Sequence, residues 1–89
     1  MYFRFKRYSE YQRRLARETL IPLLTQWKLS LDGKRVLDLG CGEGGILLEL
    51  ADTYALEGVG VDYDNGAIMR CEQKRGVRFE RGDILTRDR

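Results

Sequence analysis

The feature that most constrains the fold is a glycine-rich stretch in the middle of an 89-residue chain, Asp38-Leu39-Gly40-Cys41-Gly42-Glu43-Gly44-Gly45. Residues 35–39 have the apolar pattern of a short strand, and residues 46–54 have the pattern of a helix. Glycines are needed where a chain turns tightly from a strand into a helix and where a ligand approaches the backbone. The stretch therefore predicts a strand–turn–helix unit with a ligand beside the turn.

A helix is expected before this unit. Ser9 and Gln12 have the spacing of a capping box, which predicts a helix that begins at about Glu10. Pro22 should kink this helix, or make it break and restart. The side chains expected to pack from it recur at helical spacing: Tyr11, Leu15, Thr19, Leu20, Leu23, Leu24 and Trp27. In the helix of residues 46–54, we expect a polar side with Glu49, Asp52 and Thr53.

The rest of the chain continues the alternation of strands and helices. Residues 59–61 predict a second strand that ends at Asp62, and residues 77–79 predict a third. Between these strands, Asp64 is suited to begin a helix that Gly76 closes. A β-α-β-α-β order implies an α/β fold, in which parallel strands of an open sheet are joined by right-handed crossovers.

Ligands of open parallel sheets bind beyond the carboxyl ends of the strands. The unusual residue groups of this chain fall at three such ends. The glycine-rich stretch follows the first predicted strand, Asp62 and Tyr63 follow the second, and Gly82 and Asp83 follow the third. This coincidence predicts one binding site at that edge of the sheet.

Composition narrows the function classes. The chain is 43% hydrophobic and 34% charged with a net charge of +2, which excludes a disordered protein. It has no histidine, and its two cysteines are Cys41 and Cys71, so we expect no metal site and no histidine-based nucleophile pair. No apolar run is long enough to span a bilayer, and the N-terminus lacks the features of a signal peptide. We expect a cytoplasmic protein without membrane insertion.

Two ligand classes fit the glycine-rich stretch. Gly40, Gly42 and Gly45 match the dinucleotide fingerprint, with Asp62 about 20 residues further on, where a ribose-binding acid is expected. The same stretch also has an acid-x-Gly-x-Gly-x-Gly pattern that begins at Asp38. Residues 36–69 contain seven acids and no lysine or arginine, and Glu43 inside the turn should repel a pyrophosphate. A ligand with a cationic centre, such as a sulfonium, suits this charge better.

These motifs resemble those of the class I S-adenosylmethionine-dependent methyltransferases. Val36-Leu37-Asp38-Leu39-Gly40-Cys41-Gly42-Glu43-Gly44 resembles their first motif, Gly58-Val59-Gly60-Val61-Asp62 their second strand, and Phe79-Glu80-Arg81-Gly82-Asp83-Ile84 their third. The likeness spans about residues 33–85. It implies a Rossmann-like fold with the first part of a seven-stranded sheet ordered 3-2-1-4-5-7-6, so that the order 3-2-1 is present and the remainder is missing.

The resemblance also implies a cofactor and its site. S-Adenosyl-L-methionine is expected to contact Asp38, Gly40, Cys41, Gly42, Asp62, Tyr63, Gly82, Asp83 and Ile84. In this assignment the glycines face the methionine part of the cofactor and Asp62 accepts from both ribose hydroxyls. Tyr63 flanks the adenine, whose amino group lies near Asp83. A carboxylate suits paired hydroxyls because it accepts two hydrogen bonds at once. Catalytic residues stay unknown, because the family places them at and beyond the fourth strand.

By this resemblance the intact protein is a methyltransferase, of which residues 35–89 are a partial cofactor-binding domain after an N-terminal basic segment and helix in residues 1–34. The 89-residue chain alone is expected to be inactive, a fragment without the acceptor half of the site. A methyltransferase-like module that binds a partner without catalysis, or a dinucleotide oxidoreductase, are the alternatives. The methyl acceptor is unknown, with a small molecule favoured over RNA. We expect a homodimer, or a missing C-terminal half supplied by another chain.

Overall fold

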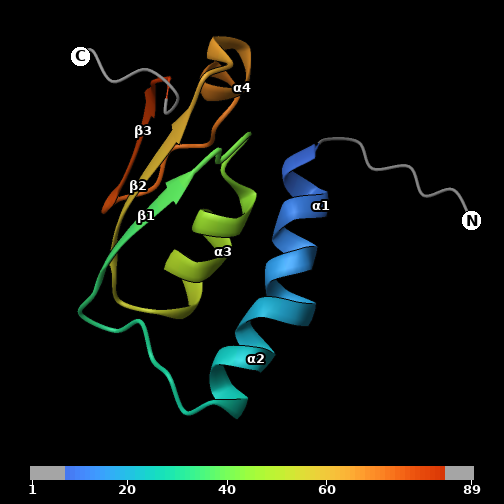
Figure 1. Ribbon diagram of the computed structural model, residues 1–89, viewed down its shortest axis with the longest axis vertical. Coiled ribbons are helices and arrows are strands. Elements are labelled where there is room, and N and C mark those ends of the chain that lie inside the picture. Colours follow the sequence, from blue (N-terminus) through green and yellow to red (C-terminus); the bar gives the residue numbers. More distant parts are fainter. Residues whose placement is uncertain (1–7, 84–89) are drawn as a thin grey trace, which may run out of the picture.

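The centre of the molecule is a three-stranded parallel sheet. In the computed structural model, which describes residues 8–83, it consists of β1 (Arg35–Leu39), β2 (Glu57–Asp62) and β3 (Val77–Arg81) in the order β1-β2-β3 (Figure 1). Both strand pairs are parallel, with Leu37 opposite Val59 in the first pair. The α/β class, the open parallel sheet and the strand order are therefore confirmed, and the predicted strands agree with the observed ones to within two residues at each end.

The N-terminal helical segment consists of α1 (Tyr8–Leu15), the π-helical turn η1 (Ala16–Leu20) and α2 (Ile21–Gln26). The helix does not break at Pro22. Instead, the π turn comes just before the proline, and the N–H of Ile21 donates to the carbonyl of Ala16 five residues earlier. Pro22 is then the second residue of α2, and the wider π turn directly before it lets the helical segment continue through the proline.

The face that α1 buries differs from the predicted one. Ser9, Gln12 and Ala16 are buried, whereas Tyr11 and Leu15 are exposed. The predicted capping box is wrong as well, because the side chain of Gln12 points across to the glycine-rich stretch rather than back to the helix start. Small and polar residues face inward here because α1 packs closely against the beginning of α3 (Gly45–Thr53).

Helix α3 supplies most of the core. Leu47 and Leu48 are almost fully buried, and Leu50 is 5% exposed. Glu49, predicted on a polar surface, is buried and pairs with two arginines of the N-terminal segment: its carboxylate lies 3.2 Å from Nε of Arg13 and 3.4 Å from Nη1 of Arg17. The side of α3 that the sequence marks as polar is therefore an interface between two helices.

Helix α4 (Asn65–Met69) is shorter than predicted. Asp64 caps it as expected, because its carboxylate accepts from the N–H groups of Gly66 and Ala67. The helix ends at Met69, and Gly76 does not close it: Gly76 lies in the turn that leads into β3, with a φ of 84°. Cys71 accordingly follows the helix rather than lying within it, and its N–H donates to the carbonyl of Ile68.

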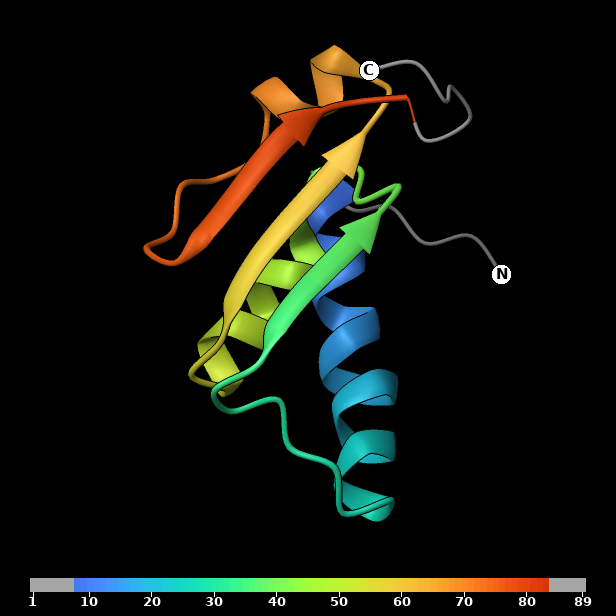
Figure 2. The ribbon, with the colours of Figure 1, turned by 60° about the vertical axis from the view of Figure 1, so that its left-hand side comes forward.

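Within residues 8–83, helices cover only one face of the sheet. Figure 2 shows the strands in front of α3 and α1. On the covered face, Gly58 and Gly60 of β2 are buried under Leu47 and Phe79. On the other face, Leu37 and Leu39 of β1 are 61% and 54% exposed. No helix in the described residues is long and apolar enough to cross a membrane.

Candidate functional site

The glycine-rich turn, residues 40–45, connects the carboxyl end of β1 to α3. The N–H groups of Gly40 and Cys41 both donate to the carbonyl of Val61, at 2.7 and 3.0 Å, which fixes the turn to the neighbouring strand β2. Gly40 has a φ of 76°, a left-handed conformation that favours glycine, and no atom lies within 4 Å of where its Cβ would stand. The turn therefore presents bare backbone to open space at this point.

Asp62, at the end of β2, joins this turn directly. One carboxylate oxygen accepts from the N–H of Gly42 at 2.8 Å, and the other accepts from the N–H of Asp64 at 2.8 Å. A carboxylate has about four acceptor positions, so each oxygen keeps one for a ligand. The structure thus brings together the predicted turn and the predicted acid. The two acids have different roles: Asp62 binds the turn, and Asp64 caps α4.

Asp38 adds a second carboxylate to this edge of the sheet. It is half-buried in β1. Burial raises the pKa of its carboxyl above the ordinary value of 3.8, and the nearby charge of Asp62 raises it further. A cationic group bound between these two acids would relieve their repulsion, which an anion would increase.

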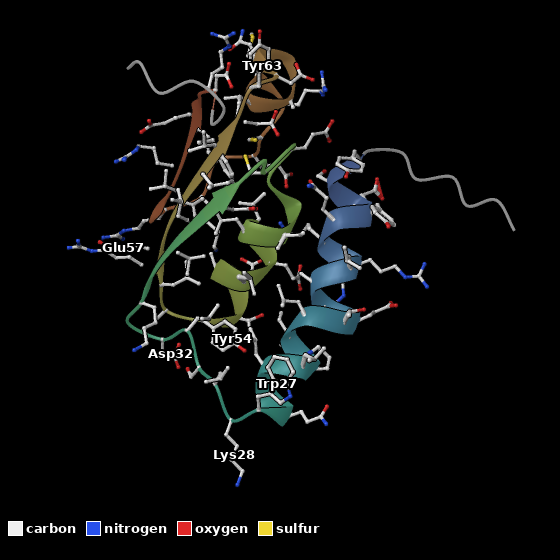
Figure 3. All side chains as sticks on the ribbon, in the orientation of Figure 1. Trp27, Lys28, Asp32, Tyr54, Glu57 and Tyr63 are labelled. Atoms are coloured by element: carbon white, nitrogen blue, oxygen red, sulfur yellow. The ribbon has the colours of Figure 1, made fainter. Side chains whose placement is uncertain are left out.

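Tyr63 and the residues after β3 lie at the same end of the sheet. Tyr63 is 62% exposed at the upper end of the molecule in Figure 3. Nε of Arg81 donates to its carbonyl at 3.1 Å, and the guanidinium lies 5.0 Å from the centre of its ring. The N–H of Gly82 donates to the carbonyl of Asp62 at 2.9 Å, and Asp83 beside it is half-buried. Ile84, the last predicted site residue, lies outside the described residues.

The two cysteines meet beneath the turn. Both thiols donate to the carbonyl of Gly42, Cys41 at 3.7 Å and Cys71 at 3.6 Å. Burial raises the pKa of Cys41 to about 12 and also raises that of Cys71. A thiol with such a pKa stays protonated at neutral pH and is a poor nucleophile or metal ligand. Among residues 8–83, no cluster of three or more His, Cys, Asp or Glu side chains could hold a metal ion.

Glu43 does not face a ligand, so the expectation that it repels a pyrophosphate is wrong. Glu43 is only 8% exposed, and one of its carboxylate oxygens accepts from the N–H of Ser9 at 3.1 Å. The other lies 2.8 Å from Nε of Arg70, which neutralises its charge, and this pairing raises the pKa of Arg70. Glu43 thus links the turn to α1 and to the end of α4.

Sequence reasoning also missed the role of Gln12. Its side chain is 5% exposed and contacts the turn at two points: Nε2 donates to the carbonyl of Cys41 at 3.0 Å, and Oε1 accepts from the N–H of Gly45 at 3.0 Å. The only signal in the sequence was the spacing of Ser9 and Gln12, which indicated a local cap. Both residues instead serve contacts with residues more than 28 positions away.

Comparison with known proteins places this geometry in a class. A coclaurine N-methyltransferase bound to N-methylheliamine and S-adenosylhomocysteine is 25% identical over 83% of this chain, with a TM-score of 0.68. A methyltransferase from Thiobacillus denitrificans in complex with S-adenosylhomocysteine is 30% identical over 74% of the chain, with a TM-score of 0.63. One from Mesorhizobium loti is 28% identical over 70%, with a TM-score of 0.60. This chain spans 24%, 29% and 30% of their respective lengths.

The fold is thus the Rossmann-like fold of the class I S-adenosylmethionine-dependent methyltransferases, as the motifs predicted. The family described as methionine biosynthesis protein MetW matches residues 23–88, and the chain belongs to that family. The comparison with curated proteins found no match.

Proposed function

We propose that this chain is the cofactor-binding part of an S-adenosylmethionine-dependent methyltransferase. The observation that carries the proposal is the hydrogen bond between Gly42 and Asp62, which joins the glycine-rich turn to an acid that keeps an acceptor position on each oxygen. In this assignment Asp62 accepts from the ribose hydroxyls. The open backbone at Gly40 receives the amino-acid part of the cofactor, with Asp38 near its positive charge.

The hydrogen bonds of the turn argue against a dinucleotide. A pyrophosphate binds to free N–H groups at the start of a helix. Here the N–H of Gly44 donates to the carbonyl of Cys41, and the N–H of Gly45 donates to Gln12. Because these donors are engaged, a pyrophosphate would have to displace the Gln12 side chain.

The cofactor supplies the activated methyl group together with its leaving group, so the protein mainly has to align two reactants. The described residues hold the cofactor side of that alignment. The acceptor and any catalytic base stay unassigned. We favour a small-molecule acceptor, as in the coclaurine N-methyltransferase bound to N-methylheliamine. We also place the protein in a reducing compartment, in keeping with its two free cysteines.

The test is a calorimetric titration of the intact protein with S-adenosylhomocysteine and, separately, with NAD. We expect binding of the first ligand only. Asp62→Ala should weaken this binding by roughly 1.5–3 kcal/mol, or about 10- to 150-fold in Kd, as expected for a hydrogen bond to a charged group. The variant will also lose some stability, because Asp62 holds two backbone N–H groups.

A matched control separates these two effects. Asp32 also accepts a backbone hydrogen bond, from Ala55 at 2.8 Å, but lies at the opposite end of the molecule (Figure 3). Asp32→Ala should therefore lower stability without changing the affinity for S-adenosylhomocysteine. Unchanged affinity in Asp62→Ala would remove Asp62 from the site, and binding of NAD instead would overturn the proposal.

A further inference from the structure

The side chain of Gln12 bridges the two ends of the glycine-rich turn. Its amide nitrogen holds the carbonyl of Cys41 near the beginning, and its amide oxygen holds the N–H of Gly45 at the end. The turn between these points contains the residue that bonds to Asp62, namely Gly42. One buried side chain from a remote helix therefore fixes the width of the segment that faces the ligand.

The packing around Gln12 leaves little room for another arrangement. A Cβ on Gly45 would stand 2.6 Å from Cβ of Gln12 and would collide with the carbonyl oxygen of Ser9. A Cβ on Gly42 would stand 3.0 Å from Nε2 of Gln12. Helix α1 thus lies directly against the turn, and the two glycines allow this approach.

An apolar side chain could fill the same space, but it would leave the N–H of Gly45 without its acceptor and would remove one of the two hydrogen bonds to the carbonyl of Cys41. The carbonyl of Cys41 still accepts from the N–H of Gly44, whereas the N–H of Gly45 donates to Oε1 of Gln12. Buried N–H groups without partners are rare because they lose their hydration without compensation. The amide at position 12 therefore contributes its hydrogen bonds as well as its volume.

We propose that Gln12 is a positioning residue that sets the shape of the glycine-rich turn and, through it, the affinity for the amino-acid half of the cofactor. The second part of this inference rests on the proposed function. The adenosine half, by contrast, contacts Asp62 and Tyr63 at the ends of other elements. Loss of Gln12 should therefore lower the affinity for ligands that carry the amino-acid part more than the affinity for ligands that lack it.

The test compares Gln12→Met with the matched control Gln26→Met, which makes the same exchange at an exposed position of α2. In the ligand-free protein, hydrogen–deuterium exchange of the amides in residues 42–45 should be faster by about tenfold in Gln12→Met, as the loss of two hydrogen bonds allows. The control should exchange as the wild type does. Equal exchange rates in Gln12→Met and the wild type would overturn the positioning role.

The ligand measurement uses two probes, S-adenosylhomocysteine and 5′-methylthioadenosine, which lacks the amino-acid part. Gln12→Met should raise the Kd for the first by about tenfold and change that for the second by less than about threefold. An equal loss for both probes would indicate general destabilisation and would overturn the inference. If the wild type binds neither probe, the proposed function fails, and the exchange rates alone decide the role of Gln12.

Gln12→Glu is the second variant, used also if Gln12→Met does not fold. Its carboxylate keeps an acceptor for the N–H of Gly45 but loses the donor for the carbonyl of Cys41. We expect it to retain slow exchange at Gly45 and to recover part of the affinity for S-adenosylhomocysteine. Fast exchange at Gly45 in this folded variant would contradict the assigned hydrogen bond.

Discussion

The two faces of the sheet are made by the same three strands, yet their surroundings are opposite. On the covered face, Leu47 of α3 is fully buried and lies against Gly58 of β2. On the bare face, Leu37 and Leu39 of β1 are more than half exposed. A strand with one solvated face normally has polar side chains on it, whereas strands covered on both faces are apolar on both. On the bare face, β1 therefore has the apolar side chains of a strand that is covered on both faces.

The covered face is also held by charge. Arg13 of α1 forms ion pairs with Glu49 and Asp52 of α3, and Lys74 before β3 lies 2.7 Å from the same Asp52 carboxylate. On the bare face the ion pairs join neighbouring strand residues instead: Arg35 with Glu57, and Arg78 with Glu80. The ion pairs of the covered face therefore join different layers of the molecule, whereas those of the bare face join only strand residues.

The largest expected effect is on the state of association. Within residues 8–83, β1 is an edge strand, and it has neither proline nor a central lysine to prevent pairing with another chain. We expect the 89-residue chain to dimerise or aggregate at micromolar concentration in analytical ultracentrifugation. Leu37→Lys and Leu39→Lys together should reduce this association, because they place charges on the bare face.

A monodisperse, cooperatively melting monomer of the wild-type chain would contradict this expectation. Association that is unaffected by the two lysines would assign it to another surface, for example the exposed side chains near the end of α2, where Trp27 is 63% exposed.

The two faces should also differ in what a leucine contributes to folding. Leu47→Ala should cost about 2–5 kcal/mol of unfolding free energy, because it removes a buried side chain and leaves a cavity. Leu37→Ala should change stability by no more than about 0.5 kcal/mol, as is usual for surface positions. Urea unfolding of both variants, at a protein concentration below the onset of association, measures the two values. Similar losses would show that Leu37 is covered in solution.

Gly45→Ala tests how closely α1 approaches the covered side. The added Cβ would collide with Ser9 and Gln12, so we expect a loss of about 1–3 kcal/mol, typical of overpacking. Gly66→Ala in α4 is the control. Its Cβ would meet only side-chain atoms at 3.2 Å or more, and an alanine within a helix stabilises by roughly 0.5–1 kcal/mol. Equal unfolding free energies for the two variants in urea denaturation would contradict the close packing at Gly45.

The strands and the Asp64 cap could be predicted from the sequence because they depend on local pattern, and the strand order followed from the resemblance to class I methyltransferases. Asp62 beside the turn followed from the rule that ligands of open parallel sheets bind beyond the carboxyl ends of the strands. The roles of Gln12, Glu43 and Glu49 could not be predicted, because each depends on a partner in another helix. In the sequence, a glutamate that will be buried against an arginine of another helix has the same helical spacing as an exposed one, and only the tertiary structure shows the arginine beside it. The end of α4 was missed because Gly76 suits a helix cap and a turn equally well.

The smallest expected effect concerns Asp38, a carboxyl on the covered side of β1. Its pKa is raised by burial and by Asp62, so the folded protein holds this proton up to a higher pH than the unfolded chain does. Below pH 3.8 the carboxyl is protonated in both states, and its ionisation costs the folded protein no stability. As the pH rises from 3.8 to the pKa of the folded state, the free energy of unfolding falls, and the loss persists at higher pH. Asp38→Asn should remove this cost and be more stable than the wild type at neutral pH.

The difference between wild type and variant is the quantity to measure, because Asp52 acts in the opposite direction. The hydrogen bond from Lys74 lowers the pKa of Asp52, so its contribution to stability is present above 3.8 and is lost as the pH falls below that value. Asp52 is common to both proteins and cancels in the difference. Urea unfolding between about pH 3 and about pH 7 should show the variant gaining on the wild type as the pH rises. The same variant should bind S-adenosylhomocysteine more weakly, because in the proposed site the carboxylate that costs stability is also the one that would attract the ligand's ammonium group. A pH-independent difference in stability would show that Asp38 is solvated, and it would remove the electrostatic reason for placing a cation beside it.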